Sequence, residues 1–432
     1  MNAPRLLPIL AALCATPLAG CDLANDLLNS NCSDFDQQYQ DDLATSAVLN
    51  ETIPATPENF PMGVVLNNRA VNYLFARLAE TNLPEIRESF RVLGQEVTIV
   101  IAPEIPLLAI GGNDACRECL AASVPFGIGV GFNNENPPLG GGQLDAQMPV
   151  TMLAIDNRKT ALTAQFEGLT VTGLTVEIPG DLPSNVLDPA EDIAARALTS
   201  YLQTRFRSAR IATFDSWELG AGEILLAGRG PFIFPEQETM LVAMQSNLPL
   251  TGAPDLQVQS AMPEGADIGF VFHPGLLLSL TRRMNYEGVV ENSVNDEGNS
   301  FDGDSSNKVT LQTMESTDEQ LLRTTARLWR TDSLCGTADL SASLGLSVGP
   351  GQFAFTIQDV EITGGEGFGS LLNADSWAGG QFIDSLVDTL NITINYDQIF
   401  GGEEGSPAEM GPFQFNIDSR GVSVYLNVLE GV

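Results

Sequence analysis

The chain has only one histidine, His273, in 432 residues. A Ser-His-Asp or Cys-His catalytic group would have to use this single imidazole, and no serine lies in a G-x-S-x-G sequence. His273 directly precedes Pro274 at the expected start of a helix, which favours a capping or packed side chain over a catalytic base. We therefore expect a protein that is not an enzyme. A hydrolase, the third hypothesis, would need a base other than His273.

Positive charge is also scarce. Lys159 and Lys308 are the two lysines, and 20 Lys and Arg residues stand against 55 Asp and Glu residues, for a formal net charge of −35. Phosphate binding requires clustered cations, so nucleic acid is excluded as a partner. Docking on anionic lipid headgroups through protein charge is disfavoured for the same reason. Solubility in a salty habitat is our preferred explanation of the acidity.

Long hydrophobic runs are missing beyond the first twenty residues. Residues 97–110 come nearest, and Pro103, Glu104 and Pro106 interrupt them. A helix that spans a bilayer needs about twenty consecutive apolar residues. The body after residue 20 is therefore expected to be soluble apart from any attached lipid.

The first twenty residues have the pattern of a secretory signal. Arg5 supplies positive charge, residues 6–18 are mostly apolar, and Leu18-Ala19-Gly20-Cys21 ends the segment with small residues before a thiol. This segment resembles the lipobox of bacterial lipoproteins. The resemblance implies that residues 1–20 are a lipoprotein signal peptide and that Cys21 carries lipid. An ordinary signal peptide that happens to contain this cysteine is the alternative.

Lipidation at Cys21 implies a place in the cell envelope. The chain would be anchored to a bacterial membrane through its N-terminal lipid, with its body in the periplasm or on the cell surface. Residues 21–60 show little regular pattern, and we interpret them as the lipidated tether.

Four further cysteines are expected to form structural disulfides in that oxidising compartment, although their pairing is open. These disulfide candidates are Cys32, Cys116, Cys119 and Cys335. The C-x-x-C spacing at Cys116 and Cys119 is also found in redox motifs and zinc sites. No second C-x-x-C and no nearby histidine support that alternative. We expect no cofactor.

One acidic segment contains a weak calcium candidate. Asp302, Asp304 and Ser306 have the one-three-five spacing of a calcium-binding loop. However, Asn307 stands where such a loop needs glycine, and Thr313 stands where it needs a bidentate glutamate. A solvated loop is the favoured interpretation, so no metal site is predicted.

Alternation of apolar with polar or small residues dominates the body, as in strands that bury one face. Residues 124–132, 340–348 and 422–428 are clear examples. Apolar stripes at helical spacing predict four helices, the second of them capped by Asp188. The predicted helices cover residues 67–79, 188–207, 274–286 and 378–390.

The order of these elements repeats. Residues 63–66 (GVVL), followed by a helix, match residues 269–272 (GFVF), followed by a helix, at a spacing of 206 residues. Residues 166–173 match residues 357–364 at a spacing of 191, and each is again followed by a predicted helix. Two matches in the same order favour an internal duplication.

A two-fold repeat of a strongly bent antiparallel sheet wrapped by helices resembles the tubular lipid-binding superfamily, whose members include proteins similar to bactericidal/permeability-increasing protein. The resemblance covers residues 61–432 and rests on the two strand-to-helix openings at residues 63–79 and 267–286. It implies an α+β fold with two pseudo-repeated lobes, each a curved antiparallel sheet wrapped by long apolar helices. The expected parts are an N-terminal lobe at residues 61–208, a central sheet at residues 209–260 that joins the lobes, and a C-terminal lobe at residues 261–432.

The same resemblance implies an apolar cavity between helix and sheet that accepts acyl chains. Its expected wall residues here are Val71, Phe75, Leu277 and Leu280. Antibacterial members of the superfamily carry a basic tip, which this acidic chain lacks, so a role in endotoxin binding is disfavoured. Our first hypothesis is a non-enzymatic, membrane-anchored lipoprotein that binds lipid or fatty acid. The alternative is an envelope lipoprotein with a packed β body that binds protein partners and no small molecule.

Overall fold

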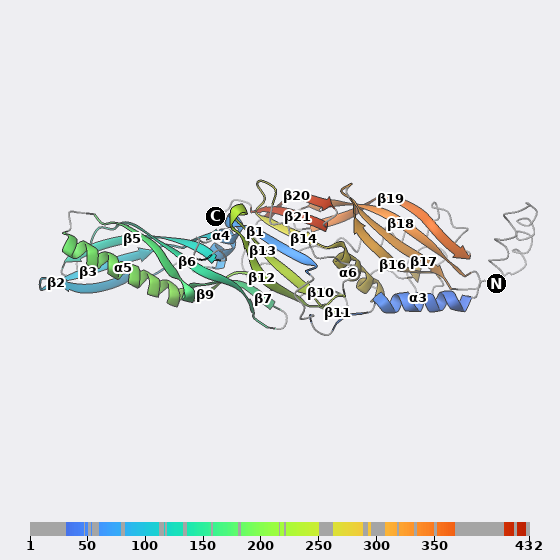
Figure 1. Cartoon of the computed structure of the whole chain (residues 1–432), viewed down its shortest axis with the longest axis horizontal. Coiled ribbons are helices and arrows are strands. Elements are labelled where there is room, and N and C mark those ends of the chain that lie inside the picture. Colours follow the sequence, from blue (N-terminus) through green and yellow to red (C-terminus); the bar gives the residue numbers. More distant parts are fainter. Residues whose placement is uncertain are drawn as a thin grey trace, which may run out of the picture.

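The computed structural model describes residues 32–249, 262–287, 293–294, 307–367 and 410–428, apart from short gaps inside these ranges. Over these residues the molecule is long and narrow, with one group of strands towards each end and a sheet between them (Figure 1). Strands such as Cys119–Phe132 and Leu322–Arg330 alternate buried side chains with less buried ones, as the sequence predicts. By contrast, Met62–Asn67, Thr239–Ser246 and Ile268–Phe272 bury nearly every side chain on both faces.

Six strands form the sheet in the middle of the molecule. They are β1 (Met62–Asn67), β12 (Leu226–Phe234), β13 (Thr239–Ser246), β14 (Ile268–Phe272), β20 (Met410–Asp418) and β21 (Gly421–Val428). Their order is β12-β13-β1-β14-β21-β20, and every neighbouring pair is antiparallel. Each half of the chain therefore contributes its first strand and its last hairpin.

The two halves meet where β1 pairs with β14. Met62 lies opposite Phe272, and Leu66 lies opposite Ile268. In the predicted repeat, residue 62 is equivalent to 268 and residue 66 to 272. The pairing therefore has the symmetry of a two-fold axis between the strands, and the predicted repeat is visible as two neighbouring strands.

The N-terminal half forms an eight-stranded sheet with two helices. Its strands follow the order β2-β3-β5-β6-β7-β9, while β4 pairs with β5 and β8 pairs with β6. Helix α5 packs on β2, β3 and β8, and α4 packs on β4 and β9. The bounds are α4 (Asn68–Leu78), β2 (Ile86–Val92), β3 (Gln95–Pro103), β4 (Leu107–Ile110), β5 (Cys119–Phe132), β6 (Gly140–Ala154), β7 (Lys159–Gln165), the 3-10 turn η2 (Phe166–Gly168), β8 (Thr170–Glu177), α5 (Ser184–Arg205) and β9 (Ser208–Asp215). A small hairpin, β10 (Trp217–Leu219) and β11 (Gly222–Ile224), precedes β12, and the 3-10 turn η3 (Pro235–Gln237) precedes β13.

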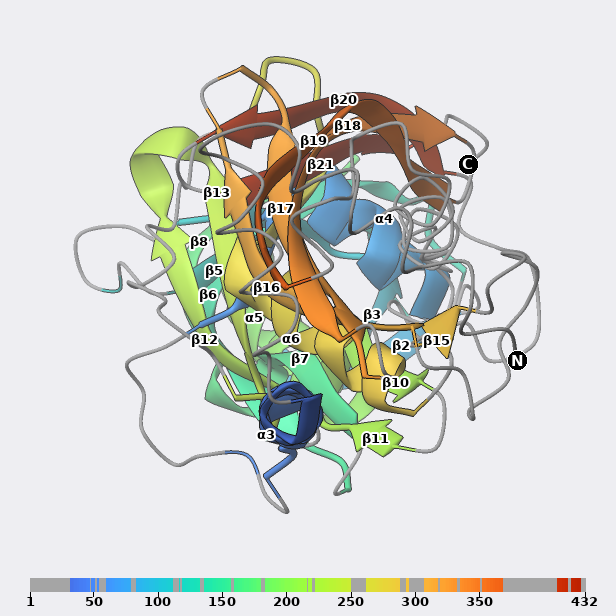
Figure 2. The same cartoon turned by 90° about the vertical axis from the view of Figure 1, so that its right-hand side faces the viewer.

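The C-terminal half forms a five-stranded sheet that curls strongly around the long axis, as Figure 2 shows end-on. Helix α6 packs on β16 near one edge of this sheet. The bounds are α6 (Pro274–Tyr286), β15 (Ser293–Val294), β16 (Asn307–Ser316), β17 (Leu322–Arg330), β18 (Gly336–Gly349) and β19 (Gln352–Gly367).

The second repeat match falls on equivalent strands. In the N-terminal half, β7, η2 and β8 together run along β6, so residues 166–173 begin at a turn that interrupts the pairing. In the C-terminal half, residues 357–364 lie inside β19, which runs along β18 without such a turn. The two halves therefore share their order of strands but differ in local continuity.

Three expectations about the fold need correction. The central sheet is not built from residues 209–260 alone, because β1, β14, β20 and β21 from other parts of the chain make up the rest of it. Strands make up more of the described structure than expected, and lobes wrapped by long helices are not confirmed. The second predicted helix is α5, which begins at Ser184 after Pro183, so Asp188 is not its cap.

The segment predicted to be a tether, residues 21–60, contains more regular structure than its sequence suggested. Residues Cys32–Ser46 form helix α3, which packs on α6, β16, β17 and β18. The structure also settles the disulfide pairing, with Cys32 bonded to Cys335 and Cys116 bonded to Cys119. The first of these joins residues 303 positions apart and fixes the start of α3 to the C-terminal half.

Several predictions lie outside the described residues. They are the signal segment 1–20, Cys21, the predicted helix at 378–390, and the calcium candidates Asp302, Asp304 and Ser306. Among the helices that the structure describes, none has the length and apolarity to cross a bilayer.

Candidate functional site

The apolar face of α4 carries the first two predicted wall residues. Val71 and Phe75 are 0% and 1% exposed. The Phe75 ring lies 6.1 Å from that of Phe166 in η2 and 5.9 Å from that of Phe206, which follows α5. The Phe166 and Phe206 rings are 5.2 Å apart, so three aromatic rings join α4 to the end of α5.

Helix α6 carries the other two predicted wall residues. Leu277 and Leu280 are 2% and 1% exposed. All four predicted wall residues belong to one continuous apolar core that extends through both halves. The structure thus places all four side chains in the interior, on the buried faces of α4 and α6. Burial alone does not distinguish a ligand cavity from a packed core.

His273 caps the start of α6, as the sequence analysis favoured. Its Nδ1 accepts a hydrogen bond from the backbone N–H of Gly275 at 2.9 Å, and Pro274 occupies the first helical position. Burial lowers the pKa of His273 because desolvation disfavours the charged imidazolium. His273 therefore has a structural role as the N-terminal cap of α6.

A buried polar centre lies beside the two-fold axis, and sequence reasoning missed it. Asp267 is 3% exposed and accepts hydrogen bonds from the Val428 backbone N–H at 2.8 Å and from the Asn67 side-chain amide at 3.1 Å. Arg69 Nη1 lies 3.4 Å from its carboxylate. The repeat marks the position of the junction, since Asn67 and His273 are 206 residues apart, but residue 61, the equivalent of Asp267, is a proline, so the repeat does not indicate the carboxylate.

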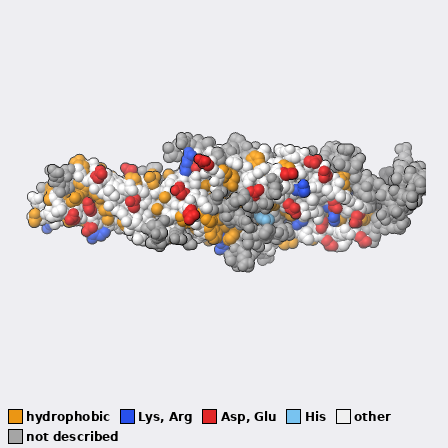
Figure 3. All heavy atoms as spheres, turned by 45° about the horizontal axis from the view of Figure 1, so that its top comes forward, with side chains coloured by type: hydrophobic (Ala, Val, Ile, Leu, Met, Phe, Trp, Pro, Cys, Tyr) orange, Lys and Arg blue, Asp and Glu red, His pale blue; other side chains and the backbone are white. Residues whose placement is uncertain are grey.

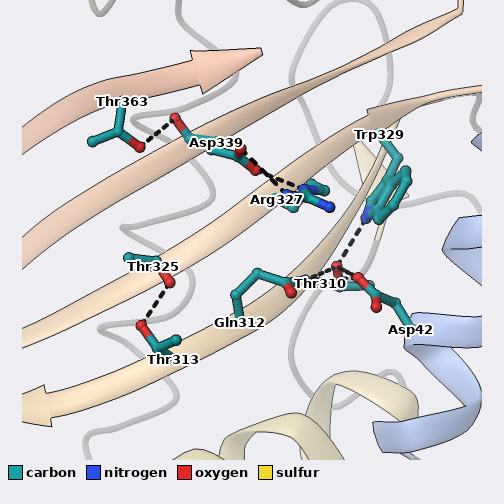
Figure 4. A network of polar contacts seen from close by, with 9 residues as sticks. All are labelled: Asp42, Thr310, Gln312, Thr313, Thr325, Arg327, Trp329, Asp339 and Thr363. Carbon is teal, nitrogen blue, oxygen red and sulfur yellow. Dashed lines mark hydrogen bonds and ion pairs between the residues drawn. The ribbon is translucent and has the colours of Figure 1, made fainter. Parts of the chain in front are cut away.

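A second polar site, between α3 and the C-terminal sheet, was also missed (Figure 4). Asp42 of α3 accepts hydrogen bonds from Gln312 Nε2 at 2.7 Å and from the Thr310 hydroxyl at 3.2 Å. Thr310 in turn accepts from the indole N–H of Trp329 at 2.8 Å. The Asp42 carboxylate thus joins α3 to β16 directly, and Thr310 extends the network to Trp329 in β17.

Aromatic contacts complete the interface of α3. Phe35 and Tyr39 are buried there, and the Tyr39 ring packs edge-on against Trp329 with centroids 6.3 Å apart. Lys308 Nζ lies 4.5 Å above the Tyr39 ring and 3.8 Å from the Asp36 carboxylate. The four-residue spacing of Phe35 and Tyr39 is the sequence signal that could have revealed this helix face, which the sequence analysis missed.

Helix α3 lies on the outer face of the curled sheet. Along β17, Ala326 and Leu328 face the apolar core, whereas Arg327 and Trp329 lie on the opposite face. On that outer face Arg327 Nε donates to Asp339 at 2.6 Å across the neighbouring strand (Figure 4). The α3 interface is therefore separate from the core that holds Leu277 and Leu280.

The described surface offers little that indicates catalysis or metal binding. In Figure 3 acidic side chains are scattered along the visible face among fewer basic ones. No group of three or more His, Cys, Asp or Glu side chains with metal-binding geometry occurs among the described residues.

No protein-family model matches the chain, and no curated protein matches it significantly. Among solved structures, a lipopolysaccharide binding protein aligns with 12% identity and a TM-score of 0.37, over 87% of this chain and 100% of its own. P47 of Clostridium botulinum E1 aligns with 12% identity and a TM-score of 0.41, over 86% of this chain and 100% of its own. P47 of Clostridium botulinum A2 aligns with 11% identity and a TM-score of 0.38, over 85% and 97%. Similarities at these scores carry no argument about ligand or activity.

Proposed function

We propose that this chain is a membrane-anchored, non-enzymatic lipoprotein that binds a hydrophobic ligand, a lipid or fatty acid, in its apolar interior. Cys21 would carry the lipid that attaches it to a bacterial membrane. Val71 and Phe75 would contact the ligand in one half, and Leu277 and Leu280 in the other.

The observation that carries the proposal is the two-fold central sheet with an apolar core on both sides of it. Strands β1 and β14 pair across the axis, and each leads directly into an apolar helix that covers the core. This is the arrangement that the resemblance to the tubular lipid-binding superfamily implies. Burial of acyl chains needs apolar area and no positive charge, so the net charge of −35 is compatible with it.

A second function is supported by the completeness of the burial. The four proposed wall residues are all at most 2% exposed. A fully packed β body that binds protein partners would give the same result. The two functions differ in one measurable property, which is whether space for a ligand exists beside α4 and α6.

The test is to insert a large side chain at that place. If Val71 or Leu280 borders ligand space, Val71→Trp and Leu280→Trp fill it, so the amount of bound lipid falls while stability changes little. If the core is solidly packed, the added volume strains it and costs about 1–3 kcal/mol of unfolding free energy. Non-covalent lipid is measured by solvent extraction and mass spectrometry of the full-length protein, and stability by chemical denaturation.

The matched control is Leu107→Trp, because Leu107 is 58% exposed on β4. It should change neither lipid content nor stability. Lipid attached at Cys21 stays with the protein during extraction, so it does not contribute to the extracted pool. A parent protein without extractable lipid, and without uptake of added phospholipid or fatty acid, would leave the packed scaffold as the function.

A further inference from the structure

Helix α3 acts as a strap along the C-terminal half. It begins at Cys32, whose disulfide partner is Cys335, and its middle is held by Tyr39. Beyond its end, the Asn50 backbone N–H donates to the carbonyl of Asn247, just after β13 of the central sheet, at 3.1 Å. The strap therefore runs from one end of the C-terminal half back to the middle of the molecule, as Figure 1 shows.

The Cys32 end of the strap lies at the outer tip of the C-terminal sheet. The register places Asn307 opposite Arg330, Arg330 opposite Gly336, and Gly336 opposite Gly367. Four strands therefore end together at this tip, and Cys335 immediately precedes Gly336. The tip lies at the opposite end of the long axis from the β2–β3 hairpin (Figure 1).

The chain between the proposed anchor and this tip is short. Cys21 and Cys32 are eleven positions apart in the sequence. A chain of that length spans at most about 40 Å, whatever its conformation. If α3 were not attached to the C-terminal sheet, the first residue after Cys21 held in the body would be Met62 in β1. The fully extended chain from Cys21 to Met62 would span up to about 140 Å.

Resting on the proposed lipidation of Cys21, we infer that the tip of the C-terminal sheet faces the membrane and that the N-terminal half projects away from it. The disulfide between Cys32 and Cys335 holds this orientation. Protein charge does not supply the attraction, because a net charge of −35 is repelled by anionic headgroups. The membrane partner of this tip is the bilayer that carries the anchor.

Lipid quenching measures the orientation. The full-length lipidated protein is placed in liposomes that contain a nitroxide-labelled phospholipid, with a genetically encoded fluorescent amino acid at one of two exposed positions. Glu366 lies at the tip of the C-terminal sheet, opposite Thr337. Leu93 lies in the β2–β3 turn at the other end. We expect several-fold stronger quenching at position 366 than at position 93.

Removing the fastening sharpens the test. Replacing both Cys32 and Cys335 with serine frees the start of α3, so the difference in quenching between positions 366 and 93 should shrink. Replacing both Cys116 and Cys119 with serine is the matched control, because that disulfide lies in the N-terminal half and should leave the difference unchanged. Asp42→Ala, which retains the Cys32–Cys335 bond, should also leave the difference unchanged, because the disulfide still attaches α3 to the sheet. If the double serine variant does not fold, the comparison of positions 366 and 93 in the parent protein still tests the orientation.

The outcomes separate the two proposals. Equal quenching at positions 366 and 93 in protein shown by mass spectrometry to carry lipid on Cys21 overturns the orientation alone. If mass spectrometry shows that the N-terminal peptide of the protein carries no lipid, the proposed anchor and the proposed orientation are both overturned. Neither result depends on whether the interior holds a ligand, which the tryptophan variants measure separately.

Discussion

The chain passes from the central sheet into a helix at Asn67 and again at His273, 206 residues later. At both places the backbone makes the same bond to the other half. The N–H of Asn67 donates to the carbonyl of Asp267 at 3.1 Å, and the N–H of His273 donates to the carbonyl of Pro61 at 2.8 Å. Pro61 and Asp267 are also 206 residues apart, so the two junctions are related by the two-fold axis.

The side chains at these junctions break that symmetry. Asn67 Oδ1 accepts from the Ala70 backbone N–H at 2.9 Å, while its amide donates to Asp267. His273 makes only the cap bond to Gly275 among the side-chain hydrogen bonds identified for it. Asp267 supplies a buried carboxylate at one junction, and Pro61 stands at the equivalent place in the other. The backbone pattern thus repeats, while the buried charge occurs once.

The largest effect is expected from removing that charge. Asp267→Ala leaves the buried Val428 N–H without its acceptor and removes one of the two acceptors of the Asn67 amide, which should cost about 3 kcal/mol of unfolding free energy. Pro61→Ala changes the equivalent position without removing a side-chain acceptor, so about 1 kcal/mol or less is expected. Urea denaturation of both variants measures the difference, and equal losses would contradict this role of the carboxylate.

A smaller effect should separate the two caps. Loss of a helix cap costs about 1 kcal/mol, which is the expected result for His273→Ala. Asn67→Ala removes a cap and also the amide that donates to Asp267 and to the carbonyl of Ala266, so about 2 kcal/mol is expected. Denaturation midpoints under identical conditions test the order. A larger loss at His273 than at Asn67 would show that the polar centre contributes little.

Sequence reasoning worked best where the signals were local. The prediction for α6 matches the structure because Pro274 suits a first helical position and an apolar stripe follows. The predicted start of α5 is too late, because Asp188 followed by Pro189 has the local pattern of a capped helix start. The helix begins at Ser184, and Pro189 is tolerated inside it. A proline near the start of a helix removes only one of the backbone bonds that support it.

Contacts between distant residues could not be predicted in the same way. The pattern of β1 predicts a buried strand, but nothing in it indicates that Met62 pairs with both Met244 and Phe272. Likewise, the spacing of Phe35 and Tyr39 gives a helix face but not its partner, Trp329. The repeat carried long-range information of another kind, because it relates β1 to β14, but it did not predict that these two strands pair.

The smallest and most specific prediction concerns pH. Burial holds the pKa of His273 below its unfolded value of about 6.5, and its Nδ1 must stay unprotonated to accept from Gly275. The folded state therefore binds this proton less readily than the unfolded state. The stability linked to His273 is present above about pH 6.5 and is lost as pH falls through the lowered pKa of the folded state.

Placing the residue of the first junction at the second isolates this contribution. His273→Asn retains a good helix cap but cannot titrate in this range, so its stability should fall less than that of the parent between pH 7.5 and pH 5. Carboxylates titrate in the parent and in the variant alike, so the difference between their losses of stability reports the side chain at position 273. Because the chain has a single histidine, its imidazole resonances also report the folded pKa directly. A value at or above that of a free histidine would mean that the imidazolium is not disfavoured at this junction, and the two caps would then differ in geometry alone.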